Sequence, residues 1–267
     1  MKVSSLQLLC CPACGGSLSL GASAAHDPVH SGQLACAKCG KNFAIKDGIA
    51  RFIKPDELVG SNKKHEKLNN LFSYICTPAT RLMFALCGGE DRARAECLDR
   101  LDLRPGGRVL EIGLGTGDNL PYLIKRVGNA EIFGIDISHS MLEHCVRNLR
   151  KWHLAAELFL AEAEHLPFRD HSFDCVYHLG AINFFTDQQR AIAEMIRVAK
   201  PGTKVVIVDE NERALRVLDK FALQLMIGKR KEVVPPIDYV PKTMQDIRLD
   251  EIWKGYGYLI EFRTPLG

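Results

Sequence analysis

The stretch V-L-E-I-G-L-G-T-G, residues 109–117, decides the fold of this chain. Its first half is a short apolar run typical of a buried strand, and its second half is rich in glycine, which permits a tight turn and a close backbone approach to a ligand. An amphipathic stretch, residues 118–127, follows at once, so the turn leads into a helix whose first N–H groups point into the same space. Asp136 ends the next apolar run, where a carboxylate can accept hydrogen bonds from two ribose hydroxyls. The alternative is an ordinary strand–helix turn with a capping Asp.

Short apolar runs and amphipathic stretches alternate after the glycine turn. This alternation predicts an α/β fold in which parallel strands are joined by helices that cover both faces of the sheet. The tail, residues 246–264, instead predicts two strands around Gly255 and Gly257, which would add antiparallel edge strands to a mainly parallel sheet. Strands are expected at residues 108–112, 132–136, 157–161, 173–178 and 204–209, and helices at residues 118–127, 138–152 and 187–199.

Two near-identical cysteine pairs, each followed by glycine, lie in the N-terminal part of the chain. A two-residue gap lets both sulfurs of a pair face one metal ion, and two pairs supply the four thiolates of a closed, structural zinc site. The alternatives are coincidence or a redox dithiol pair, and Cys10, His26 and His30 are kept as substitute ligands. The predicted zinc ligands are Cys11, Cys14, Cys36 and Cys39.

The composition is that of a packed protein in a reducing compartment. Hydrophobic residues make up 46% and charged residues 25%, and the formal net charge of +3 is too small to argue for a nucleic-acid partner. No apolar run approaches the roughly 20 residues of a membrane span, and no signal peptide is recognisable. We therefore expect a cytoplasmic protein without a transmembrane segment. The composition changes near Pro55, which predicts a zinc-ribbon module at 1–54, a linker at 55–62 and a second domain at 63–267.

The second domain resembles the Rossmann-like methyltransferases that use S-adenosylmethionine, especially the ubiquinone/menaquinone biosynthesis methyltransferase type. The glycine turn reads Glu-x-Gly-x-Gly-x-Gly and not the Gly-x-Gly-x-x-Gly of dinucleotide-binding folds. The resemblance spans residues 104–210 and rests on five blocks in family order: residues 109–117, 134–138, 161–168, 172–174 and 197–202. It implies a methyltransferase with S-adenosylmethionine as cofactor.

The resemblance also implies roles for individual residues. The three glycines would pass under the methionine part of the cofactor, Asp136 would hold the ribose and Ile137 would pack on the adenine. Glu162 stands where relatives have Asp, so the adenine contact is expected to shift toward the N–H of Ala163. His178 would border the methyl group. The cofactor-binding candidates are Glu111, Gly113, Gly115, Gly117, Asp136, Ile137, Glu162, Ala163 and His178.

The N-terminal segment, residues 8–52, is similar to the small zinc-ribbon activator proteins that bind methyltransferases of translation factors and transfer RNA. In those systems the ribbon is a separate chain, whereas here it is fused. The resemblance implies a stabilising or substrate-presenting role for the ribbon.

The catalytic residue is left open by the sequence. Methyl transfer depends mostly on alignment of the acceptor, and a base is needed only if the acceptor loses a proton. The catalytic candidates are His178, Asp209 and Glu210, although His178 also fits a wall residue and the two acids also fit helix caps. By analogy, residues 62–100 form a lid over the cofactor and residues 214–227 cover the acceptor, next to the basic residues 229–231.

Three functions are compared. The first is methylation of a small or amphipathic metabolite, and the alternative is methylation of RNA or protein with the ribbon as substrate adaptor. The third is a binding protein that retains the fold. The near-neutral charge and the absence of an Asn/Asp-Pro-Pro-Tyr block favour the first, and the glycine turn with Asp136 argues against the third. The acceptor and the oligomeric state do not follow from the sequence.

Overall fold

The structure, a computed structural model, describes residues 1–21, 26–54, 56–64, 66, 84–85, 87–218 and 233–267. Two predictions therefore lie largely outside the described residues. These are the central part of the predicted lid, with Phe72, Tyr74 and Met83, and most of the predicted acceptor-covering segment with the basic residues 229–231.

The N-terminal part is built from short antiparallel strands. It contains the 3₁₀ turn η1 (Val3–Leu8) and the strands β1 (Leu18–Leu20), β2 (Gly32–Cys36), β3 (Asn42–Lys46) and β4 (Ile49–Arg51).

Strands and helices alternate in the rest of the chain, as the hydrophobic pattern predicts. The elements are α3 (Glu90–Leu98), β5 (Arg108–Ile112), α4 (Leu120–Val127), β6 (Glu131–Asp136), α5 (His139–Trp152), β7 (Glu157–Leu160), β8 (Cys175–Leu179), η2 (Ile182–Phe184), α6 (Gln188–Val198), β9 (Lys204–Glu210), α7 (Glu212–Leu218), η4 (Pro236–Tyr239), β10 (Gln245–Ile252), η5 (Trp253–Gly255) and β11 (Gly257–Arg263).

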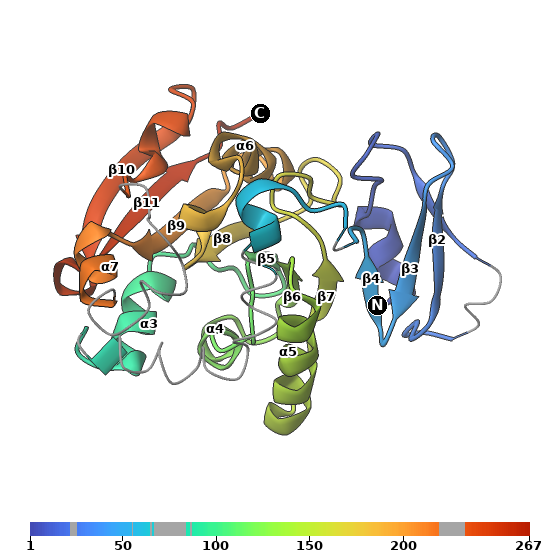
Figure 1. The fold of residues 1–267 in the computed structure, drawn as a ribbon, viewed down its shortest axis with the longest axis horizontal. Coiled ribbons are helices and arrows are strands. Elements are labelled where there is room, and N and C mark those ends of the chain that lie inside the picture. The colour runs from blue at the N-terminus through green and yellow to red at the C-terminus, as the bar shows by residue number, and fades with distance from the viewer. Residues whose placement is uncertain (22–25, 55, 65, 67–83, 86, 219–232) are drawn as a thin grey trace.

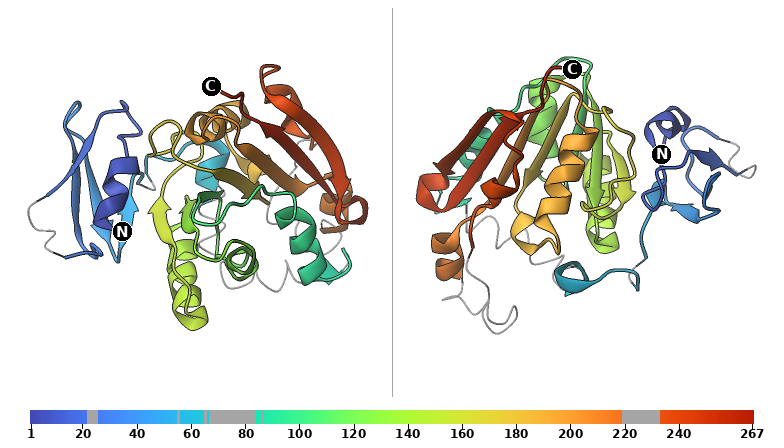
Figure 2. Two further views of the ribbon diagram at one scale, coloured as in Figure 1. Left: turned by 180° about the vertical axis from the view of Figure 1, so that it is seen from behind. Right: turned by 90° about the horizontal axis from the view of Figure 1, so that it is seen from above.

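All strands join one sheet in the order β1-β2-β3-β4-β7-β6-β5-β8-β9-β11-β10. The strands from β7 to β9 are parallel, while β11 and β10 are added antiparallel at one end, which confirms the predicted sheet. Figure 1 shows the N-terminal strands at one end of the molecule and β10 with β11 at the other. Helix α6 covers one face of the sheet and helices α4 and α5 cover the opposite face (Figure 2).

Local chemistry explains where the helices begin. The Ser138 hydroxyl accepts a hydrogen bond from the N–H of Met141 and caps α5, and the Asp187 carboxylate accepts from the N–H of Arg190 and caps α6. Helix α7 is capped by Asn211, whose Oδ1 accepts from two N–H groups of its first turn. The two acids before Asn211 are therefore not needed as helix caps.

The apolar core continues from the N-terminal strands into the helix-covered part. Phe43 and Phe52 lie 5.0 Å apart between ring centroids, and Phe52 contacts Phe159 of β7 at 6.4 Å. Strand β4 pairs in parallel with β7, so the ribbon extends the sheet at the edge where β7 would otherwise end it. The division of the chain at residues 54 and 62 stays a prediction. Among the described residues, none of the helices combines the length and the apolar character needed to cross a lipid bilayer.

Candidate functional site

The glycine turn connects β5 to α4 and closes over the ends of the neighbouring strands. Gly113, Gly115 and Gly117 all have positive φ angles, of 68°, 58° and 78°. At Gly113 a Cβ atom would lie 3.2 Å from Cε1 of His178, and at Gly117 it would lie 2.7 Å from Sγ of Cys145. Glycine is therefore needed at both ends of the turn for conformation and for space.

Asp136 ends β6 beside this turn and is 7% exposed. Its Oδ2 accepts a hydrogen bond from the N–H of Gly115 at 2.8 Å, and its Oδ1 accepts from the N–H of Ser138 at 2.8 Å. Burial raises the pKa of Asp136 to about 6, against the lowering effect of these N–H donors. Backbone donors therefore hold both carboxylate oxygens of Asp136 in place at the wall of the cavity.

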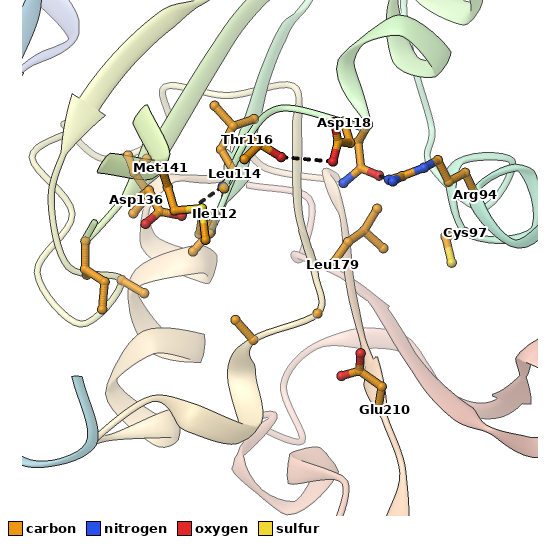
Figure 3. Close-up of a pocket in the computed structure, with 18 of the residues that line it drawn as sticks. Arg94, Cys97, Ile112, Leu114, Thr116, Asp118, Asp136, Met141, Leu179 and Glu210 are labelled. Carbon is orange, nitrogen blue, oxygen red and sulfur yellow. Dashed lines mark hydrogen bonds between the residues drawn. The ribbon is translucent and has the colours of Figure 1, made fainter. Parts of the chain in front are cut away.

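A cavity of about 300 Å³ opens where the glycine turn and Asp136 meet. Figure 3 shows Asp136 with Met141 on one side of the cavity and Arg94 with Cys97 on the other, while Glu210 lies apart from both. The residues that line the cavity include Ile112, Gly113, Leu114, Gly115, Thr116, Asp118, Asn119, Asp136, Ile137, Ala161, Ala163, Leu179, Ala181 and Phe185, together with Phe84, Arg94, Glu210 and Trp253.

Glu111 lies beneath the glycine turn, 1% exposed and not among the residues that line the cavity. Its carboxylate accepts from Nδ2 of Asn119 at 2.6 Å and from the hydroxyl of Tyr177 at 2.7 Å. Burial raises the pKa of Glu111 to about 7. Asn119 in turn accepts from the guanidinium of Arg94, so a buried polar chain runs from Glu111 to a cation on the cavity wall.

The loop after β7 forms a wall of the cavity through Ala161 and Ala163. The carboxylate of Glu162 points elsewhere, because its Oε1 accepts from Nδ2 of Asn62 at 3.1 Å. Ile137 lines the cavity beside Asp136. Of the residues expected at the adenine, Ile137 and Ala163 therefore line the cavity, and Glu162 is not among its lining residues.

His178 is fully buried in β8 and is not among the residues that line the cavity. Its Nδ1 lies 2.7 Å from the carbonyl oxygen of Ile112, and its Nε2 accepts from the N–H of Ala181 at 2.9 Å. Burial lowers the pKa of His178 to about 4, so the ring is neutral at pH 7. With both nitrogens occupied, the ring supports Gly113 and has no free nitrogen to accept a proton.

The two adjacent acids at the end of β9 differ in exposure. Asp209 is fully buried, with Oδ2 accepting from the N–H of Asn183 at 2.8 Å, and burial raises its pKa well above the usual range. Glu210 lines the cavity beside Leu179, Phe185 and Trp253. Of the three catalytic candidates, Glu210 is the one whose carboxylate can meet a bound molecule.

Four cysteines meet at one end of the N-terminal strands. The Sγ atoms of Cys11, Cys14, Cys36 and Cys39 all lie within 4.8 Å of one another, with Cys11 and Cys39 at 3.7 Å and Cys14 and Cys36 at 3.5 Å. Tetrahedral zinc with bonds of about 2.3 Å needs sulfurs roughly 3.8 Å apart, so the set fits one zinc ion. N–H groups of Cys39 and Lys38 lower the pKa of Cys36 to about 6, which favours a thiolate. Within the described part of the chain, Cys10, His26 and His30 are not in this cluster.

The zinc-binding part is joined to β7 and to the segment that follows β7 by backbone and side-chain hydrogen bonds. The N–H of Phe52 donates to the carbonyl of Leu160 at 2.8 Å, and the N–H of Arg169 donates to the carbonyl of Leu8 at 2.8 Å. Glu157, at the start of β7, accepts from the hydroxyl of Ser5 at 2.5 Å. Because β7 leads directly into the loop with Ala161 and Ala163, the ribbon abuts a strand that ends at the cavity.

Sequence reasoning did not identify Phe84, Arg94, Phe185 and Trp253 as site residues. For Arg94 the sequence shows only that it lies three residues before Cys97, and the structure is needed to show that both side chains are buried on one face of α3. For Trp253 no local signal existed. It reaches the cavity because Gly257 pairs with Glu210, which brings the turn before β11 against the end of β9.

Comparison with known families divides the chain in two. Residues 109–202 match the model of a methyltransferase domain, and residues 4–48 match that of Trm112p-like proteins. Two separate parts of the chain thus resemble a methyltransferase domain and a Trm112p-like protein.

Among curated proteins, the chain is similar to the ubiquinone/menaquinone biosynthesis C-methyltransferase UbiE of Burkholderia mallei and of Burkholderia thailandensis. The identity is 34% over 155 residues in both cases. The alignment covers 57% of this chain and 64% of those relatives, so it leaves about a third of each relative unmatched.

Solved structures share the fold at low sequence identity. A complex of the Haloferax volcanii Trm112 methyltransferase activator with its methyltransferase has a TM-score of 0.56 at 18% identity, covering 73% of this chain and 97% of that chain. Phosphoethanolamine N-methyltransferase 2 of Haemonchus contortus, in complex with S-adenosyl-L-methionine, has a TM-score of 0.57 at 15% identity, covering 78% and 61%. The [4+2]-cyclase SpnF has a TM-score of 0.55 at 17% identity, covering 78% and 98%. The fold therefore serves more than one reaction.

Proposed function

We propose that this chain is an S-adenosylmethionine-dependent methyltransferase whose acceptor is a small or amphipathic molecule. The observation that carries the proposal is the buried carboxylate of Asp136, held by the N–H of Gly115 and directed into a cavity of about 300 Å³. When bound, S-adenosylmethionine supplies a sulfonium-activated methyl group. The protein then has to bind, orient and exclude water.

Each cavity wall has a role in this proposal. Asp136 accepts hydrogen bonds from the ribose hydroxyls, Ile137 packs on the adenine, and the N–H of Ala163 meets the adenine edge. The glycine turn lies under the methionine part, supported from below by Glu111 and His178. Glu162 acts through its neighbours and holds the adenine loop in place.

Arg94 extends the proposal to the carboxylate of the methionine part. Its guanidinium lines the cavity on the side away from Asp136 (Figure 3). It is held in position by Glu90, at 2.8 Å, and by Asn119, and it stacks over Phe84 at 5.0 Å. A guanidinium held in this way presents remaining N–H donors to an anionic ligand.

The acceptor is proposed to lie between Arg94 and Glu210. The wall there consists largely of aromatic and aliphatic side chains, namely Phe84, Leu179, Phe185 and Trp253. Glu210 is the proposed hydrogen-bond acceptor or base for a group that loses a proton, with Asp209 as its buried neighbour. An apolar wall with one carboxylate suits a small molecule better than a phosphate backbone.

The second candidate is an RNA or protein methyltransferase in which the ribbon presents the substrate. The match of residues 4–48 to Trm112p-like proteins favours it. We propose a structural zinc ion in the ribbon under either function. We also propose the division into residues 1–54, 55–62 and 63–267, and a cytoplasmic location.

One experiment separates the two candidates. The protein is incubated with methyl-labelled S-adenosylmethionine and a cell extract, and small molecules are then separated from RNA and protein. We expect the label in the small-molecule fraction. Label that stays with macromolecules and is released by nuclease or protease would establish the second candidate instead.

A further inference from the structure

One asparagine between the ribbon and the helix-covered part is buried where its neighbours are not. Asn62 is 3% exposed, whereas Ser61 and Lys63 on either side of it are exposed. It belongs to a short helical stretch, residues 60–64, in the segment that the sequence suggests is a linker. A buried amide needs hydrogen-bond partners, so the groups that it contacts define its role.

The side chain of Asn62 joins two separate loops. Its Nδ2 donates to Oε1 of Glu162 at 3.1 Å and to both oxygens of Glu164, at 3.0 and 3.1 Å. Its Oδ1 accepts from the N–H of Thr186 at 3.0 Å, while its own N–H donates to Oγ1 of Thr186 at 3.0 Å. Asn62 thereby connects the loop after β7 with the loop that precedes α6.

The backbone around Asn62 is shaped for this contact. Gly60 has a φ of 56°, and a Cβ atom there would lie 2.7 Å from Cγ2 of Thr186. The hydroxyl of Thr186 also donates to the carbonyl of Val59 at 3.2 Å. The segment can approach the loop before α6 this closely because residue 60 is glycine.

Both loops held by Asn62 also line the cavity. The first contributes Ala161 and Ala163, and the second contributes Phe185. Between them lie the neighbouring carboxylates of Glu162 and Glu164, of which the second is 4% exposed. Like charges this near repel one another, and a shared donor offsets that repulsion. The Asn62 amide is a shared donor to both carboxylates.

We propose that Asn62 is a positioning residue that sets the separation of the two cavity-lining loops, the one with Ala161 and Ala163 and the one with Phe185. It acts through Glu162, Glu164 and Thr186, and it needs no contact with the cofactor. This inference rests on the proposed function, because the ligand whose fit it controls is S-adenosylmethionine or the product S-adenosylhomocysteine.

The decisive variant is Asn62→Asp. It keeps the shape of the side chain and the acceptor for Thr186, but it replaces the shared donor with a third carboxylate. We expect the Kd for S-adenosylhomocysteine, measured by calorimetry, to rise about tenfold or more, the scale of a lost hydrogen bond to a charged group. Gly60→Ala, which pushes the segment away from Thr186 without touching the amide, should act in the same direction.

A swapped pair and a control test the mechanism. In the double variant Asn62→Asp with Glu164→Gln, the cluster again contains one amide and two carboxylates, as in the wild type, so affinity should recover toward the wild-type value. Asn42→Asp, the same chemical change at an exposed position of β3, should leave affinity unchanged. If Asn62→Asp does not fold, Asn62→Ser replaces it, since that change removes the amide without adding charge.

The outcomes separate three explanations. Wild-type affinity in a folded Asn62→Asp protein, or a double variant no better than the single one, would overturn the positioning role. A lower melting temperature with unchanged affinity would assign Asn62 a purely structural role and would also overturn it. Failure of the wild-type protein to bind S-adenosylhomocysteine would instead refute the proposed function on which the inference rests.

Discussion

Replacing Asp136 with Asn should weaken cofactor binding strongly while leaving the fold in place. The carboxylate accepts from the N–H groups of Gly115 and Ser138 at 2.8 Å each, and Asp136 lines the cavity. Hydrogen bonds to a charged group are worth about 1.5–3 kcal/mol each. An amide of the same shape keeps one acceptor oxygen and turns an NH₂ group toward an N–H or a ribose hydroxyl. The net loss should be about 2–3 kcal/mol, or roughly 30- to 150-fold in Kd.

The assay is calorimetric titration of S-adenosylhomocysteine at pH 8, where Asp136 is ionised. The matched control is Asp170→Asn, because Asp170 is 65% exposed in its side chain, pairs with Arg197 and does not line the cavity. Both variants lose one negative charge, and only the first should lose affinity. Equal affinities for the two variants in folded protein would remove Asp136 from the cofactor site.

Three further predictions concern the zinc ion, the pH and the acceptor. Elemental analysis should find one zinc ion per chain. Cys36→Ser should lower the zinc content and unfold the ribbon before the rest of the protein, because the free energy of metal binding at such sites is part of the free energy of folding. A zinc-free protein with all four cysteines reduced would contradict this prediction. Because the pKa of Asp136 is raised to about 6, its carboxylate is ionised above this pH. Cofactor affinity should therefore be highest above pH 7, should fall as the pH drops through 6, and should lose this pH dependence in Asp136→Asn. A flat wild-type affinity profile between pH 5 and 8 would count against this role of Asp136. Glu210→Gln should keep cofactor affinity and slow methyl transfer by about 10²–10⁴-fold if the acceptor loses a proton to Glu210, and an unchanged rate would exclude Glu210 as the base.

Local patterns were sufficient to predict the fold and the position of the glycine turn. The apolar run at residues 108–112, the glycines after it and the acid at the end of the next strand are close in sequence, so their geometry follows from strand and helix periods. The four cysteines were also found in this way, because two short gaps define each half of the cluster. The structure places these residues where the pattern predicts.

The roles of His178, Asp209 and Glu210 depend on how the strands pair, which the sequence alone could not predict. His178 is a neutral, fully buried support for Gly113, and this follows only from the pairing of β8 with β5. In the sequence, a buried supporting histidine at a strand end looks the same as an exposed catalytic histidine at that place. Glu210 and Asp209 are adjacent in sequence, and the pleat of β9 turns one toward the cavity and buries the other.

The sequence also did not predict the contacts of the segment between the two modules. A linker is identified from composition, whereas Asn62 is defined by partners about 100 residues and more away in sequence. Likewise, the pairing of β4 with β7 makes the ribbon part of the sheet, which its cysteine spacing does not reveal.

The measurement that tests the central claim most directly is the formation of S-adenosylhomocysteine. The zinc-loaded protein is incubated with S-adenosylmethionine and the small-molecule fraction of a cell extract, and the products are quantified by mass spectrometry. We predict S-adenosylhomocysteine in equal amount to a new methylated small molecule, and the loss of both in Asp136→Asn at low cofactor concentration. Intact S-adenosylmethionine with no methylated product, in protein that is folded and loaded with zinc, would contradict a methyltransferase acting on small molecules.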